Sequence, residues 1–89
     1  MVEEKVLVKN KLGLHARPSA LLVKTASGFR GCNIFLSRDG QVINGKSIMG
    51  VMMLAANLGS EVTITVQGEE EEQALSALVK LFEDKFGEE

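Results

Sequence analysis

The chain of 89 residues carries 45% hydrophobic and 25% charged side chains with a formal net charge of −2, which fits one small folded domain over residues 1–89. The slight acidity and the absence of Trp and Tyr argue against a nucleic-acid partner, because neither a basic stripe nor a stacking platform is available. A single cysteine, Cys32, the absence of a signal-peptide pattern and the absence of a long apolar run predict a cytoplasmic protein without membrane insertion.

Four segments alternate apolar and polar residues as β-strands do. They begin at Val2, Cys32, Gln41 and Glu61, and Asp39-Gly40 between the second and the third is a tight hairpin signal. Leu7 and Phe35 are expected on the wet face of the sheet. The side chains expected to face the core are Val6, Val8, Cys32, Ile34, Leu36, Val62, Ile64 and Val66.

Three helices are expected around these strands. The first begins at His15 and closes near Gly28, the second is opened by Ser47 as an N-cap, and the third begins with four consecutive acids, residues 69–72. Helical spacing predicts core positions at Val51, Leu54, Ala55 and Leu58 on the second helix, and at Leu75, Leu78, Val79, Phe82 and Phe86 on the third, which Gly87 should end.

The element order β-α-β-β-α-β-α predicts an α/β (α+β) domain. Alternating strands imply a sheet with one wet face, and amphipathic helices can cover the other face. We therefore expect a four-stranded antiparallel sheet with three helices on one face, while periodicity alone leaves the strand order open.

His15 and Pro18 are the sole histidine and the sole proline, with Arg17 between them. Pro18 suits the first turn of a helix, so His15 is expected at a helix N-terminus, where unpaired N–H groups point outward. These groups favour an anion such as phosphate, and Arg17 adds a planar fork of donors. Imidazole is a nucleophile near neutral pH, so the arrangement fits a side chain that accepts a phosphoryl group. An ordinary capping histidine is the alternative.

Two motifs carry a family resemblance. The segments Leu14-His15-Ala16-Arg17-Pro18-Ser19-Ala20 and Gly45-Lys46-Ser47-Ile48-Met49-Gly50-Val51-Met52 resemble HPr, the histidine-containing phosphocarrier family of the bacterial phosphoenolpyruvate:sugar phosphotransferase system. The resemblance covers essentially the whole chain. It implies an open-faced β-sandwich with strand order 1-4-2-3.

The resemblance also implies a relay. Enzyme I gives a phosphoryl group to Nδ1 of His15, and the phosphoprotein donates it to an enzyme IIA domain, so the chain is a carrier rather than a free-standing enzyme and needs no cofactor. Arg17 and the N–H groups of Ala16 and Arg17 would hold the phosphoryl oxygens, with Pro18 stiffening the turn. A metal site is not expected, because there is no second histidine and Cys32 should point inward.

The second helix carries more apolar residues than one buried stripe needs. Ile48, Met49, Met52 and Met53 lie off that stripe, so the helix is either buried on two sides or presents a docking patch, for which flexible Met side chains are suited. We favour docking, in agreement with the family's contacts to enzyme I and enzyme IIA. The expected docking residues are Ile48, Met49, Met52, Ala20, Leu21 and Lys24.

Ser47 has two interpretations. As an N-cap it needs no further role. Its surroundings also resemble the site that HPr kinase/phosphorylase phosphorylates, which would put negative charge inside the docking patch and bring in a catabolite regulator as a partner.

The resemblance leaves the branch of the family open. Residues 10–13 and the acidic last helix look like the nitrogen-related branch, NPr, whereas the Ser47 region looks like the sugar-system HPr. A regulatory module that only docks on other proteins, without carrying phosphate, is a further alternative. We expect a monomer in each case.

Overall fold

The computed structural model describes residues 1–88, which form a four-stranded sheet, three α-helices and a final 3₁₀ turn. No helix within this range is long and apolar enough to cross a membrane. The elements are β1 (Val2–Leu7), α1 (Ala16–Ser27), β2 (Cys32–Arg38), β3 (Gln41–Asn44), α2 (Ile48–Met53), β4 (Glu61–Gly68), α3 (Glu71–Glu83) and the 3₁₀ turn η1 (Lys85–Gly87).

The strands pair in the order β1-β4-β2-β3, and every pair is antiparallel. This confirms the predicted sheet and the strand order that the family resemblance implied. Opposite residues on the buried face are both apolar, as in the pairs Val6↔Val62 and Ile34↔Val66. A one-residue slip would turn these side chains into water, so the alternating pattern specifies the register.

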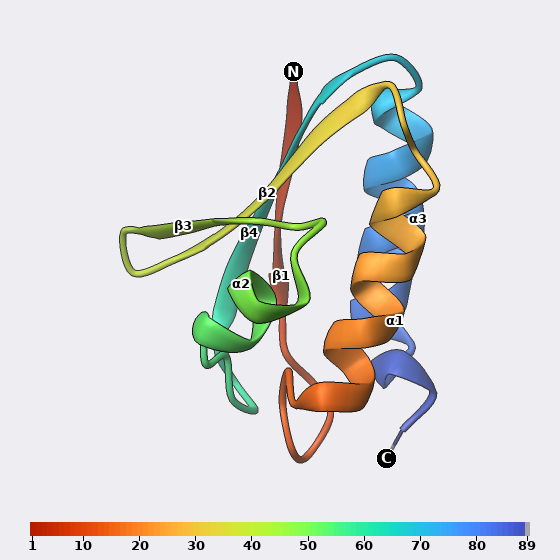
Figure 1. The fold of residues 1–89 in the computed structure, drawn as a ribbon. Helices are drawn as coiled ribbons and strands as arrows, with labels where there is room; N and C mark the ends of the chain where they lie inside the picture. The colour runs from red at the N-terminus through yellow and green to blue at the C-terminus, as the bar shows by residue number, and fades with distance from the viewer. Residues whose placement is uncertain (89) are drawn as a thin grey trace.

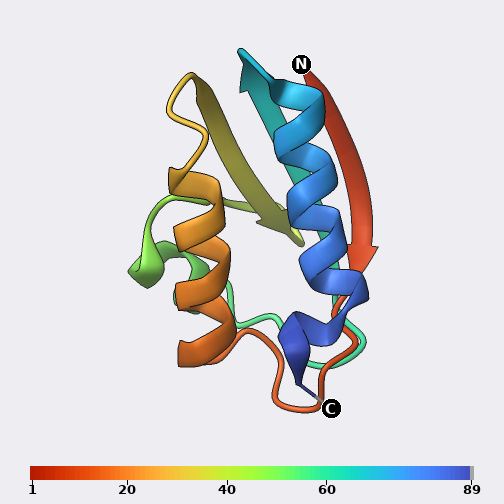
Figure 2. The ribbon, with the colours of Figure 1, turned by 90° about the vertical axis from the view of Figure 1, so that its right-hand side faces the viewer.

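The sheet and helices form two layers, seen edge-on in Figure 1. In Figure 2, α1 and α3 run side by side across one face of the sheet, and the short α2 packs against α1 and β3. The strand side chains predicted to point inward are all buried, including Val8 just beyond the end of β1. Leu22, Ala26, Ala74, Leu78 and Phe82 meet them from α1 and α3.

The other face of the sheet is open to solvent. Leu7 is 50% exposed and Phe35 38% exposed, which confirms their predicted place on the wet face. The predicted hairpin is also present, and Asp39 and Gly40 both have positive φ, as a two-residue loop of this kind requires.

Two of the predicted core positions on the second helix are wrong. Val51 and Leu54 are buried, but Ala55 is exposed and Leu58 is 56% exposed. The helical spacing fails because α2 ends at Met53 and Ala55 has a left-handed φ of 53°. The chain therefore turns away, and Ala56 is buried instead.

The end of the third helix also differs from the prediction. Helix α3 ends at Glu83 rather than at Gly87, and Phe86 follows in η1 with a left-handed φ of 54°. Phe86 is nevertheless buried, because its ring packs edge-on against Phe82 at 4.9 Å between centroids. Leu75 and Val79 are only half-buried, at the margin of the stripe.

Candidate functional site

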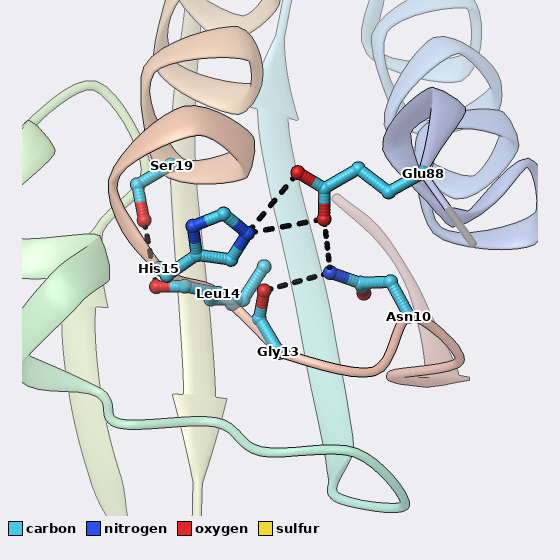
Figure 3. Close-up of polar contacts among 6 residues, drawn as sticks. All are labelled: Asn10, Gly13, Leu14, His15, Ser19 and Glu88. Carbon is cyan, nitrogen blue, oxygen red and sulfur yellow. Dashed lines mark hydrogen bonds and ion pairs between the residues drawn. The ribbon is translucent and has the colours of Figure 1, made fainter.

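His15 is the N-cap residue of α1, as predicted. Its carbonyl oxygen accepts the Ser19 N–H at 3.0 Å, which closes the first helical turn. The buried Ser19 hydroxyl donates to the Leu14 carbonyl at 2.9 Å (Figure 3). The backbone on both sides of His15 is therefore fixed by hydrogen bonds.

Two backbone donors at this helix end are open. Among residues 1–88, the N–H groups of Ala16 and Arg17 have no acceptor, and Pro18 has no N–H to offer. Ala16 and Arg17 are exposed, whereas Pro18 is buried. The open donors and the positive end of the α1 dipole favour an anion at this place.

The imidazole of His15 is contacted at Nε2 by the carboxylate of Glu88. Its Nε2 atom lies 3.1 Å from both carboxylate oxygens of Glu88 (Figure 3), while the side chain keeps 35% of its exposure. An ionised carboxylate only accepts hydrogen bonds, so this contact favours a proton on Nε2, which in the neutral imidazole leaves the lone pair on Nδ1. Nδ1 makes no hydrogen bond within the described part of the chain.

Asn10 connects Glu88 to the loop before the helix. The side chain is fully buried, and its Nδ2 donates to the Gly13 carbonyl at 2.7 Å and to Oε1 of Glu88 at 3.1 Å. Its Oδ1 atom has no partner among the residues that the structure describes. Both hydrogen bonds donated by the Asn10 amide therefore fix groups next to His15, namely the Gly13 carbonyl and the Glu88 carboxylate.

The pKa of Glu88 is lowered from its usual value of 4.5. The hydrogen bond from His15 is the main cause, and the hydrogen bond from Asn10 and the nearby charges of His15 and Arg17 act in the same direction. Partial removal of the carboxyl from water opposes them. Glu88 is therefore an anion at neutral pH.

The exposed apolar residues of the second helix form what we call the α2 patch, made of Ile48, Met49, Met52 and Met53. Their exposed fractions are 45%, 68%, 41% and 64%. Only Val51 is buried within α2, so the alternative of a helix buried on two sides is wrong.

The other expected docking residues lie on α1, the helix that α2 packs against. Ala20 and Lys24 are exposed and Leu21 is half-buried. They stay predicted docking residues.

Ser47 caps α2, because its hydroxyl accepts the Gly50 N–H at 3.0 Å. The predicted N-cap is confirmed. The adjacent Lys46 is occupied elsewhere: its Nζ donates to the carbonyls of Phe29 and Cys32 at 2.9 Å and 2.6 Å.

Sequence reasoning missed Glu88 and Asn10. Glu88 lies 73 positions from His15, and no local pattern links them. The left-handed conformation at Lys85 and Phe86 brings Glu88 to the histidine. Neither residue type predicts a turn of this kind. Within residues 1–88 no three potential metal ligands gather.

The chain matches known proteins over nearly its whole length. Residues 2–84 match the family described as "PTS HPr component phosphorylation site". Phosphocarrier protein HPr of Treponema pallidum is 52% identical over 89 residues, which cover 100% of both chains.

Solved structures agree with this match. HPr from Thermoanaerobacter tengcongensis superposes with a TM-score of 0.95 at 49% identity, covering 100% of this chain and 99% of that one. A second structure from the same bacterium, described as an HPr dimer, has a TM-score of 0.78 at 49% identity and covers 99% of this chain and 100% of that one. This chain belongs to the HPr family of phosphocarrier proteins of the phosphotransferase system.

Proposed function

We propose that this protein accepts a phosphoryl group from phosphorylated enzyme I on Nδ1 of His15 and donates it to enzyme IIA domains. One observation carries the proposal: Nε2 of His15 contacts Glu88, while within residues 1–88 Nδ1 and the two N–H groups of Ala16 and Arg17 at the helix start have no hydrogen-bond partner. The protein is a covalently modified carrier and not an enzyme with its own substrate. Family membership supports this assignment.

The transfer is an in-line displacement. The lone pair of Nδ1 forms a bond to phosphorus while the bond between phosphorus and the phosphorylated group of enzyme I breaks, and the electron pair of that bond returns to the donor group. Positioning and charge stabilisation dominate such a step. In this proposal the N–H groups of Ala16 and Arg17 and the Arg17 guanidinium hold the phosphoryl oxygens.

His15→Ala tests the proposal. Wild-type protein mixed with phosphoenolpyruvate and enzyme I should gain one acid-labile phosphoryl group, while the variant should gain none and keep its fold. Labelling of the variant would overturn the assignment. Running the assay with enzyme I from both the sugar and the nitrogen systems also decides between the HPr and NPr branches.

Ser47 is a proposed second modification site. Ser47 is half-buried at the start of α2, beside the exposed α2 patch. A phosphate there would put charge beside the surface proposed for enzyme I and for enzyme IIA, and would hinder docking. Incubation with ATP and HPr kinase/phosphorylase should add mass at Ser47 but not to Ser47→Ala.

The rival function is a docking module that carries no phosphate. The exposed Met side chains of the α2 patch favour it. It requires partner binding to survive in His15→Ala while no phosphoryl group is ever accepted by the wild type. The labelling assay therefore separates the two functions.

A further inference from the structure

We infer that Glu88 is a positioning residue for His15, oriented in turn by Asn10, and that it fixes which ring nitrogen is nucleophilic. The inference rests on the proposed function, since it concerns how the same histidine accepts a phosphoryl group. It assigns a role to a carboxylate far away in the sequence from both family motifs.

The geometry restricts the imidazole to one tautomer. Both oxygens of Glu88 lie 3.1 Å from Nε2, so the ring meets an acceptor on that side whichever oxygen it uses. The Nδ1–H tautomer would turn a lone pair on Nε2 toward the carboxylate, which is repulsive. The Nε2–H tautomer is favoured, and it leaves the Nδ1 lone pair open.

Glu88 is itself held in place. Asn10 is fully buried and bridges Oε1 of Glu88 to the Gly13 carbonyl. The Glu88 N–H donates to the Lys85 carbonyl at 2.9 Å, and Phe86, two residues earlier, is anchored in the core. The carboxylate is therefore presented to the ring by a buried amide and a buried aromatic side chain.

Glu88 also faces the charge that develops during transfer. When neutral His15 forms the P–N bond through Nδ1, the Nε2 proton stays and the ring becomes positively charged. The carboxylate 3.1 Å away stabilises this charge. No proton has to leave the pair, so the hydrogen bond persists through the step.

The test compares Glu88→Ala and Glu88→Gln with the wild type. In Glu88→Ala the ring loses its acceptor, so ¹⁵N NMR of neutral His15 should show a mixture of tautomers in place of the nearly pure Nε2–H form. Phosphoryl acceptance should slow about tenfold, the usual scale for loss of one charge-assisted hydrogen bond. Glu88→Gln keeps an acceptor oxygen without the charge, so it should restore the tautomer but only part of the rate.

The control is Glu83→Ala, which removes an equal charge from an exposed position on the last turn of α3. It should leave the tautomer and the rate unchanged. Equal tautomer ratios and equal rates in Glu88→Ala and the wild type would overturn the inference while leaving the carrier function standing. Absence of phosphoryl acceptance by the wild type would instead overturn the proposed function, and the NMR comparison would still test the tautomer.

Discussion

Gly13 packs directly against the backbone of Ala56, and the two segments are joined by a hydrogen bond of 2.9 Å from the Leu14 N–H to the Ala56 carbonyl. A Cβ on Gly13 would overlap that carbonyl and lie 2.8 Å from the Cα of Asn57. Gly13 also has a left-handed φ of 66°. The loop that leads into His15 therefore packs against the connection between α2 and β4.

Gly13→Ala should destabilise the protein by about 2–4 kcal/mol, because strain at positive φ adds to a clash with rigid backbone. Urea unfolding measures the change. Gly59→Ala is the matched control, since Gly59 also has positive φ (88°) but has nothing within 4 Å of the added Cβ. That variant should lose only about 1 kcal/mol, and equal losses in both would argue against the close approach.

Arg17→Lys should slow phosphoryl acceptance about tenfold without abolishing it, because lysine keeps the charge but loses the planar fork of donors. Rapid-quench labelling by phosphorylated enzyme I measures the rate. Arg30→Lys makes the same chemical change at an exposed residue beyond the far end of α1 and should have no effect. An unchanged rate in Arg17→Lys would remove the guanidinium from the mechanism.

Met49→Glu should weaken binding to enzyme I about tenfold or more, because it places a charge in the middle of the apolar surface proposed for docking. Met49 is 68% exposed, so the free energy of unfolding should barely change. Calorimetric titration gives the dissociation constant. Val42→Glu alters an equally exposed apolar residue, at 63%, on β3, and binding that falls equally in both variants would contradict a specific α2 patch.

Glu71 should contribute an acid-sensitive part of the stability. The Gly68 N–H, donating to Oε2 at 3.1 Å, is the largest cause that lowers the pKa of Glu71 below 4.5, and the terminal ammonium group adds to it. A carboxyl whose pKa is lowered on folding stabilises the protein above its unfolded-state pKa, and this stability is lost as the pH falls through the folded-state pKa.

Glu71→Gln should therefore be less stable than the wild type at pH 7, with a difference that shrinks as the pH falls below 4.5. Thermal unfolding across this range measures it. Glu72→Gln, at an exposed neighbouring position, serves as the control. A difference between Glu71→Gln and the wild type that is independent of pH would show that ionisation of Glu71 is not involved.

The sequence was most informative where local pattern and tertiary packing agree. The strand β4 shows strict alternation, and Val62, Ile64 and Val66 are all fully buried. The hairpin at Asp39-Gly40 and the Ser47 cap depend on short-range chemistry alone. They were predicted correctly for that reason.

Prediction failed where a helix ended without a local signal. Ala55 and Phe86 both take left-handed φ values, and neither residue type favours that region. Packing decides these positions: Phe86 turns back onto Phe82, and Ala56 replaces Ala55 in the core. The strand order required the family resemblance, because periodicity does not encode which strands are neighbours.

The same limit applies to the site. His15, Arg17 and Pro18 stand together in the sequence and could be grouped by reading it. Glu88 reaches the ring only through the turn after α3. Asn10 would pass for an ordinary turn residue, since its donation to the Gly13 carbonyl is a local contact and only its bond to Glu88 reveals the link.

Contact between Glu88 and the imidazole has a practical consequence for handling the protein. An affinity tag fused after residue 89 would begin two residues beyond Glu88 and would crowd the contact between this carboxylate and Nε2. Met1 lies at the opposite end of the molecule, against Glu71 at the start of α3 (Figure 1). Tags and fluorescent labels for kinetic work therefore belong at the amino terminus, where they leave the histidine's surroundings untouched.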